Sequence, residues 1–138
     1  MNRRRTFGLM AILILWVAVR FVADDDMAKY LTRGRSNGRV WAIFDLNAKL
    51  TYLDGLHDGA VEAALLVSGK NYFPAEMNAG DFSNKEIVKQ IDAFYTDGSN
   101  VRVPIVWAFQ YMVKKTNGTK STDLEDYAAT LRKLSNEK

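Results

Sequence analysis

The sequence contains no cysteine and a single histidine, His57. A chain without cysteine has no disulfides, no thiolate metal ligands and no thiol nucleophile. One histidine excludes metal sites that are built from several imidazoles. The sequence also lacks a Walker loop, a dinucleotide-binding glycine pattern, a nucleophile elbow and a paired-histidine zinc motif. These absences exclude the most recognisable classes of enzyme, and we expect no catalytic site, no cofactor and no bound metal ion.

Acidic residues are missing from the first 23 residues, which contain Arg3, Arg4, Arg5 and Arg20. The rest of the 138-residue chain carries 15 basic and 16 acidic side chains, so the net charge of +3 comes from the N-terminal stretch. A domain that binds nucleic acid carries its positive charge on the folded body. We therefore expect no nucleic-acid partner. The length, with 48% hydrophobic and 25% charged residues, predicts one globular domain.

The N-terminal stretch is typical of an export signal. Three arginines at 3–5 precede an uncharged apolar run of 14 residues at 6–19, and three aspartates follow at 24–26. This order of charge is expected when the N-terminus stays inside the cell. A helix that spans a bilayer needs about 20 apolar residues. Because Arg20 interrupts the run, we predict that residues 1–23 are either a signal peptide or a signal anchor.

Several alternatives remain open for this segment. Cleavage after Ala23 would release a soluble protein, although Phe21 stands where signal peptidase prefers a small side chain. Without cleavage, residues 6–23 would anchor the protein in the inner membrane, with Arg20 at the outer boundary. Arg4 and Arg5 also fit a twin-arginine signal. The remaining alternative is a buried helix of the domain. The first three alternatives predict a periplasmic location, soluble or anchored.

The remainder of the chain is predicted to be an all-α bundle of about four helices. Residues 24–40 are polar and contain Gly34 and Gly38, which is typical of a linker, so the helical domain is expected at 41–138. No segment alternates long enough to predict a strand. The first helix is expected within 41–67, with a break near Asp45, a helical repeat of apolar residues and an end at Gly69. That repeat consists of Leu46, Leu50, Leu53, Leu56, Ala60, Ala64 and Val67.

Capping signals predict the other three helices. A Ser, Thr, Asp or Asn three positions before a Glu forms a capping box, and proline is favoured in the first turn. The predicted helices are 84–96 after the box of Ser83 and Glu86, 104–116 beginning at Pro104, and 123–135 after the box of Thr122 and Glu125. Pro104 is given a structural role at the start of its helix.

The stretch from Lys49 to Gly59 is the best candidate for a functional surface. Tyr52, Asp54, His57 and Asp58 lie close together on a helix, and a histidine beside carboxylates can bind a cation or act as a general base. Three such groups are too few for a zinc site, and a solvated surface cluster is the simpler interpretation.

The spacing of two glycines in the same stretch suggests close packing. Gly55 and Gly59 are four positions apart, so they share one face of the helix. Each costs about 1 kcal/mol relative to alanine. We therefore expect another helix or a ligand to approach closely at this face, which gives the two glycines a structural role.

Aromatic residues provide a second candidate surface. Trp107 and Tyr111 are four positions apart and lie partly off the apolar face of their helix. The simplest interpretation places the aromatic residues of this chain in the core. The functional interpretation is an aromatic-lined groove for a peptide, a lipid or a partner helix, with this pair as its exposed part.

Several short motifs lie along the chain: Asn37-Gly38 with Trp41, Lys49-xx-Tyr52-xx-Gly55-xx-Asp58-Gly59, Ile91-Asp92 with Phe94-Tyr95, and Asp97-xx-Asn100-xx-Val103-Pro104-Ile105. They resemble those of small, exported, all-helical bacterial proteins of unassigned function. More distantly, the layout is similar to the Rap1a/Tai type of periplasmic immunity proteins, which neutralise secreted cell-wall-degrading effectors. The resemblance covers roughly residues 37–116.

The simpler account of what the resemblance implies is structural: Asn100 and Pro104 shape the 95–104 turn, and Tyr52 and Asp58 form hydrogen bonds to it. The alternative is a binding site formed by this turn and the helix of Tyr52 and Asp58, with Tyr95 and Asn100 as further candidate binding residues. We therefore expect a non-enzymatic protein-binding domain, such as an inhibitor, an immunity-like protein or an accessory factor. The alternatives are an anchored structural or assembly subunit and, third, a small metal-dependent hydrolase. The expected partner is another protein, with the inner membrane as a second partner if the signal is retained.

Overall fold

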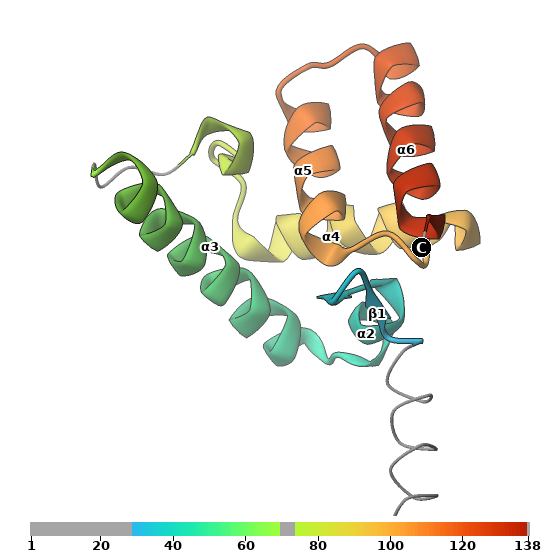
Figure 1. The fold of residues 1–138 in the computed structure, drawn as a ribbon, viewed down its shortest axis with the longest axis horizontal. Coiled ribbons are helices and arrows are strands. Elements are labelled where there is room, and N and C mark those ends of the chain that lie inside the picture. Colours follow the sequence, from blue (N-terminus) through green and yellow to red (C-terminus); the bar gives the residue numbers. More distant parts are fainter. Residues whose placement is uncertain (1–28, 70–73, 138) are drawn as a thin grey trace, which may run out of the picture.

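The computed structural model describes residues 29–69 and 74–137, which are mostly helical and confirm the all-α class (Figure 1). The described part holds five α-helices, a two-stranded hairpin and two short 3-10 helices, η1 and η2. Their bounds are β1 (Leu31–Thr32), β2 (Arg35–Ser36), α2 (Gly38–Ile43), α3 (Leu46–Ser68), η1 (Ala75–Met77), α4 (Asn84–Tyr95), η2 (Gly98–Asn100), α5 (Ile105–Thr116) and α6 (Ser121–Asn136). The predicted targeting segment, residues 1–23, lies outside the described residues. Among those described, no helix combines the length and apolarity needed to cross a membrane.

Local capping chemistry sets most of the helix ends, as predicted. The Asp45 side chain accepts a hydrogen bond of 2.7 Å from the Ala48 amide and begins α3. Ser83 and Glu86 form the complete capping box of α4, and the hydrogen bonds from Ser83 lower the pKa of the Glu86 carboxyl. Gly69 ends α3 in the left-handed conformation at φ +67°. Each such cap is worth about 1 kcal/mol because it satisfies a helix-end group that has no partner in the helix.

The predicted start of the last helix is wrong by two residues. α6 begins at Ser121, with Lys120 as its N-cap residue and no capping side chain. Thr122 therefore lies inside the first turn, where its hydroxyl donates to the Asp123 carboxylate at 3.3 Å. The spacing of Thr122 and Glu125 matches a capping box, but the helix begins before it.

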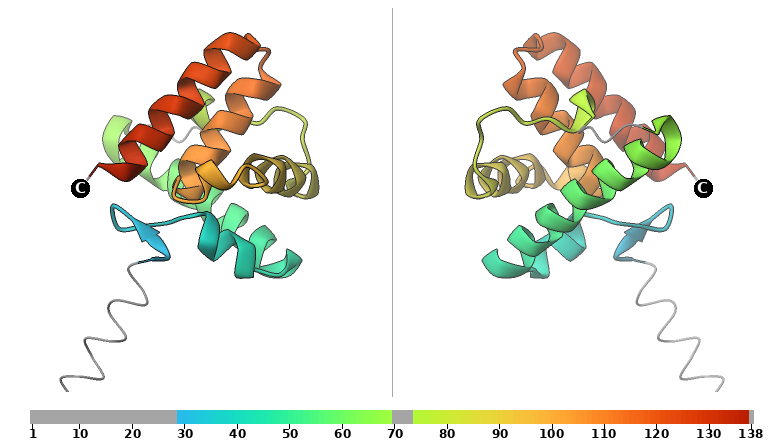
Figure 2. Two further views of the ribbon diagram at one scale, coloured as in Figure 1. Left: turned by 90° about the vertical axis from the view of Figure 1, so that its right-hand side faces the viewer. Right: turned by 90° about the vertical axis from the view of Figure 1, so that its left-hand side faces the viewer.

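α5 and α6 run side by side, and α4 crosses their ends (Figures 1 and 2). The core lies where these three helices meet α2 and the turn before α5. Its most deeply buried apolar side chains are Trp41, Ile91, Val103, Ile105, Ala108 and Met112. α3 leans away from this core as a long arm whose far end projects from the body (Figure 1). The arm therefore has faces that the core does not cover.

The predicted linker at 24–40 is wrong over its described part, which begins at residue 29. Thr32 pairs with Arg35 across the hairpin, and α2 begins at Gly38. Thr32 and Asn37 are only 3% and 1% exposed. The segment looks like a linker because it is polar, but the groups that bury it come from far along the chain. The folded domain therefore begins before residue 41, and α2 and α3 are separate helices that meet near the predicted break at Asp45.

Asn37 joins this segment to the rest of the domain. Its side-chain oxygen accepts from the Arg39 amide at 3.0 Å and caps α2, while its amide nitrogen donates to the Thr32 hydroxyl at 3.2 Å and to the Lys29 carbonyl at 3.1 Å. Its backbone pairs with Pro104 as an isolated bridge. A buried amide is stable only when its donors and acceptors find partners, and Asn37 satisfies this condition.

Gly38 lies directly against the ring of Tyr95. Its amide donates to the Val101 carbonyl at 3.0 Å, and a Cβ atom placed on it would lie 2.6 Å from two ring carbons of Tyr95. The Tyr95 hydroxyl in turn donates to the Val103 carbonyl at 2.9 Å. Glycine is required here because only hydrogen fits between the α2 backbone and the ring.

Trp41 connects α2 with both α3 and α4. Its indole nitrogen donates to Asp92 at 2.7 Å, and the Lys49 ammonium binds the same carboxylate oxygen at 2.7 Å. Lys49 also lies 5.1 Å from the centroid of the Trp41 ring, and Tyr52 meets that ring edge-on at 6.4 Å. We call Asn37, Gly38, Trp41, Asp92 and Tyr95 the α2–α4 junction. It fixes the near half of α3 against the body.

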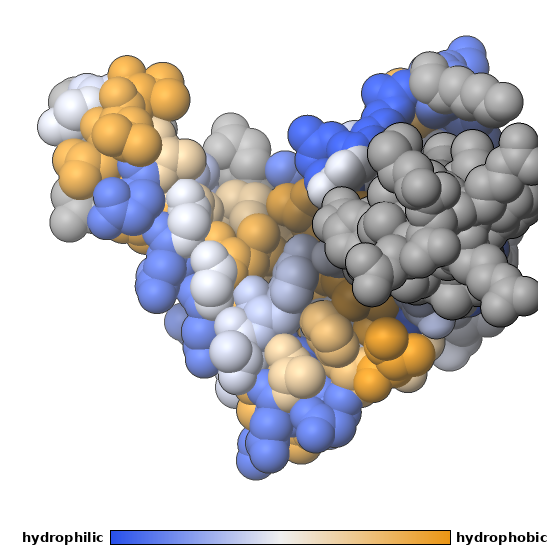
Figure 3. Space-filling view, turned by 60° about the horizontal axis from the view of Figure 1, so that its bottom comes forward, coloured by the Kyte–Doolittle hydropathy of each residue, from blue (hydrophilic) through white to orange (hydrophobic). Residues whose placement is uncertain are grey.

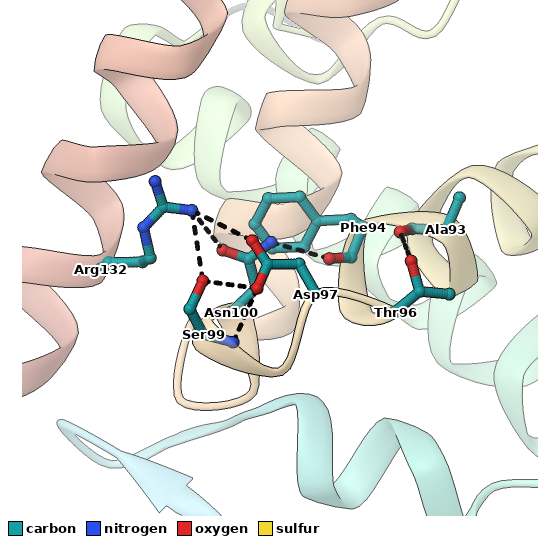
Figure 4. A network of polar contacts seen from close by, with 7 residues as sticks. All are labelled: Ala93, Phe94, Thr96, Asp97, Ser99, Asn100 and Arg132. Carbon is teal, nitrogen blue, oxygen red and sulfur yellow. Dashed lines mark hydrogen bonds and ion pairs between the residues drawn. The ribbon is translucent and has the colours of Figure 1, made fainter.

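The turn between α4 and α5 is held by a network around Asn100 (Figure 4). The buried Asn100 amide donates to the Phe94 carbonyl at 2.8 Å, and its oxygen accepts from Arg132 of α6 at 3.0 Å. Asp97 accepts two hydrogen bonds from Ser99, which lower the pKa of its carboxyl, and lies 3.6 Å from Arg132. These contacts hold together the ends of α4, α5 and α6.

We predict that Gly38→Ala destabilises the domain by about 1–3 kcal/mol, because the new methyl group overlaps the Tyr95 ring. The matched control is Gly98→Ala, since a Cβ there meets nothing within 4 Å. Chemical denaturation monitored by circular dichroism measures both changes. Equal stability of the two variants would contradict the close contact.

Candidate functional site

Asp54, His57 and Asp58 lie on an open face of α3. Asp54 accepts a hydrogen bond of 2.7 Å from the Asn84 side chain. The His57 Nδ1 lies 3.5 Å from Asp58, and these two side chains are 57% and 84% exposed. Within residues 29–69 and 74–137, no group of three His, Cys, Asp or Glu side chains could hold a metal ion. The cluster therefore has the properties of a solvated surface.

Tyr52 and Tyr95 stabilise the fold through packing and hydrogen bonding. Tyr52 packs against Trp41 and Phe44, and burial raises the pKa of both tyrosines above the ordinary value. The resemblance suggested hydrogen bonds from Tyr52 and Asp58 to the 95–104 turn. Neither side chain forms such a bond with the described residues of that turn. Asp58 points into solvent instead, whereas Asn100 does shape the turn, as the resemblance implied.

Trp107 and Tyr111 do not form the exposed aromatic pair that was expected. Both are half-buried against the core. The Arg35 guanidinium lies 5.9 Å from the Trp107 ring, and the Tyr111 ring lies 4.8 Å from that of Phe94. The pair lies at the edge of the core, between the two interpretations, and Tyr111 also lines a cavity. Pro104, given a structural role above, directly precedes α5 as its N-cap residue.

A polar cavity of about 330 Å³ lies between α4, α5 and α6. Its lining includes Asn100 and Tyr111 together with two basic and two acidic side chains: Lys115, Arg132, Asp97 and Glu125. Arg132 already binds Asn100 and lies beside Asp97. The cavity therefore carries balanced charge, part of which holds the turn in place, and it offers no excess charge to select a ligand.

An apolar surface that the described residues leave open runs along α3. This 23-residue helix buries only Leu53 and Ala64. A groove of about 510 Å³ follows it, and a second hollow of about 200 Å³ shares Leu56 and Met77 with that groove. We call the two together the α3 trough. The groove is lined by Gly55, Leu56, Gly59, Ala60, Ala63, Ala64, Val67, Pro74, Met77 and Val106. Figure 3 shows the hollow beside the projecting arm.

Gly55 and Gly59 lie open at the edge of the trough. A Cβ atom on either one would meet nothing within 4 Å among the described residues. No element among the described residues approaches these glycines closely, so the expected close approach of another helix or a ligand stays a prediction. Together with Ala63, they form a row of small residues one helical turn apart, which leaves the α3 backbone accessible to another element.

The far end of α3 exposes large apolar side chains. Leu66 and Val67 are 84% and 89% exposed, and Leu65 is 39% exposed. Figure 3 shows this apolar end of the arm. The helical repeat predicted Val67 and Leu46 in the core, but Leu46 is also 50% exposed. The run of Leu65, Leu66 and Val67 could have predicted this exposure. Three consecutive residues point to different sides of a helix, so one buried face cannot cover all of them.

No protein-family model, curated protein or solved structure matches this chain. The resemblance to exported bacterial proteins therefore stays a prediction. The function has to be inferred from the geometry of the α3 trough and from the N-terminal sequence.

We predict that Gly55→Ala and Gly59→Ala each raise the free energy of unfolding by about 1 kcal/mol, because alanine favours the helix and its methyl group enters open space. The control is Gly69→Ala, which lowers stability since φ is +67° at that position. Thermal and chemical unfolding measure these changes. A loss of stability at position 55 or 59 would show that part of the protein already packs against these glycines.

Proposed function

We propose that the protein is an exported, non-enzymatic binding domain that receives a segment of a partner protein in the α3 trough. The observation that supports this proposal is the combination of open glycines with an exposed apolar helix end along one groove. Inhibitors, immunity-like proteins and accessory factors are the classes that fit such a domain.

The shape of the trough favours a protein segment over a small ligand. A helix of 23 residues is about 34 Å long. Small ligands bind in concave pockets that cover most of their surface, whereas the trough is open along one side of α3. A helix lying in an apolar groove is a common mode of peptide recognition.

The exposed apolar side chains also provide a driving force for association. Complete burial of Leu66 or Val67 contributes about 1.5–3 kcal/mol each. A dissociation constant near 1 μM corresponds to about 8 kcal/mol. Burial of these two side chains together with the apolar lining of the trough is therefore of the size that a specific complex needs.

The N-terminal sequence supports a second candidate, an anchored structural or assembly subunit. In that case residues 6–23 hold the protein in the inner membrane, and the trough binds another component of the same complex. A small hydrolase has less support, since of Asp54, His57 and Asp58 only His57 lines the smaller hollow, while Asp58 is 84% exposed.

Export is tested by intact-mass measurement and cell fractionation of the protein expressed in a bacterium. We expect either residues 24–138 in the periplasm or the full-length chain in the membrane fraction, because a basic start followed by an apolar run directs export. The first result favours the soluble binding protein, and the second favours the anchored subunit. Recovery of the full-length chain in the cytosol would contradict both.

The trough is tested by photo-crosslinking in cells that naturally express the protein. A photoreactive residue at Ala63 should form an adduct with one protein, because this position lies exposed in the groove. We expect Gly59→Leu to abolish the adduct without lowering stability, since leucine fills open space.

The matched control is Asp126→Leu, which adds the same side chain to the exposed face of α6. It should leave the adduct unchanged, and purification should show that the captured protein is stoichiometric. An adduct that persists in the Gly59→Leu variant would contradict the proposed binding surface.

A further inference from the structure

We infer that the segment that binds the trough is a cationic amphipathic helix, with an apolar stripe and a flanking row of Lys or Arg. This inference rests on the proposed function, because it names the chemistry of the partner at the same surface. Three features carry it: the layout of side chains on α3, the charge along the edge of the trough, and the exposed backbone at the glycines.

Residues four positions apart form parallel rows along a helix. On α3, Gly55, Gly59 and Ala63 form a row of small residues. The neighbouring row toward the body is apolar and lines the groove: Leu56, Ala60 and Ala64. The neighbouring row on the other side is acidic: Asp54, Asp58 and Glu62. The open face of the helix is thus small and apolar, with one negatively charged border.

The acidic border is exposed and is not neutralised by its own helix. From Leu50 to Ser68 the chain contains three carboxylates and no Lys or Arg. Asp54 accepts from a neutral amide, and Asp58 lies beside His57. A partner that brings Lys or Arg to this border gains attraction, and a partner that brings carboxylates is repelled. The border therefore selects the sign of the partner's charge.

The small-residue row favours a helix over an extended chain. An extended segment has unpaired backbone amides and carbonyls, and the groove beside Gly55 and Gly59 is lined by apolar residues whose side chains offer them few partners. A helix satisfies these groups internally. Its side-chain ridges can pack into the groove above Gly55 and Gly59, where the absence of side chains permits a close approach.

Two other occupants fit the charge less well. A second copy of this chain would present an identical α3, whose one cationic side chain, Lys49, already binds Asp92. An anionic bilayer surface would repel that border, although it would accept Leu66 and Val67. Both occupants are included as outcomes of the test.

The test uses the full-length protein in mild detergent and two labelled helical peptides. Both peptides carry the same Leu and Ala stripe, and their flanking row is Lys in one and Glu in the other. We expect fluorescence anisotropy to show about tenfold tighter binding of the Lys peptide at low salt, with the difference shrinking as ionic strength rises.

The triple variant Asp54→Asn, Asp58→Asn, Glu62→Gln should remove this preference. The control removes the same charge from exposed positions of α6, by Asp123→Asn, Glu125→Gln and Asp126→Asn, and should keep it. Gly59→Leu should weaken the binding of both peptides. Together these variants separate the contribution of charge from that of the apolar groove.

Equal binding of the two peptides, or a preference for the Glu peptide, would overturn the cationic partner while leaving the trough as a binding surface. Failure of both peptides to bind, or binding that Gly59→Leu does not weaken, would overturn the trough and the proposed function with it. A dimer that dissociates in the Gly59→Leu variant would assign the surface to a second copy. Binding to anionic vesicles through the same residues would assign it to a bilayer.

Discussion

The contact of Gly38 with the Tyr95 ring is the constraint on which the rest of the fold depends. It brings the backbone of α2 against the end of α4, where a side chain at position 38 would overlap the ring. From there the Tyr95 hydroxyl reaches the Val103 carbonyl, and the Gly38 amide reaches Val101. The turn before α5 is therefore fixed from the same point. Asn37 then joins the hairpin to this turn, so that one junction orients α2, α4 and the start of α5.

The surroundings of Gly38 differ from those of Gly55 and Gly59, which suggests different reasons for glycine at these positions. At Gly38 the Tyr95 ring occupies the space that a side chain would need. Gly55 and Gly59 instead face space that no described residue occupies. Each of these helical glycines lowers stability by about 1 kcal/mol without any packing gain from the described residues. Stability selected on its own would favour alanine at both positions. The approach of an outside element gives a physical reason for keeping glycine.

Local chemistry made most of the fold predictable, and long-range contact explains what was missed. The cap at Asp45, the box of Ser83 and Glu86 and the stop at Gly69 depend on residues within one helical turn, so sequence patterns predicted them. The burial of Asn37 depends on Pro104, which no local pattern reveals. For the same reason the exposure of α3 was predicted only in part: the helix itself was predicted, but its apolar far end was assigned to the core.

The α2–α4 junction also determines what kind of binding surface α3 can be. Lys49 and Tyr52 fasten the near half of the helix to Trp41 and Asp92, while the far half extends beyond the body. A helix held in this way presents its groove in one orientation before any partner arrives. Association then loses less conformational entropy than it would with a mobile segment, and more of the apolar burial at Leu66 and Val67 remains as affinity. The rigid junction and the exposed arm are thus two parts of one arrangement, in which packing at one end of α3 holds the other end in place for the proposed binding.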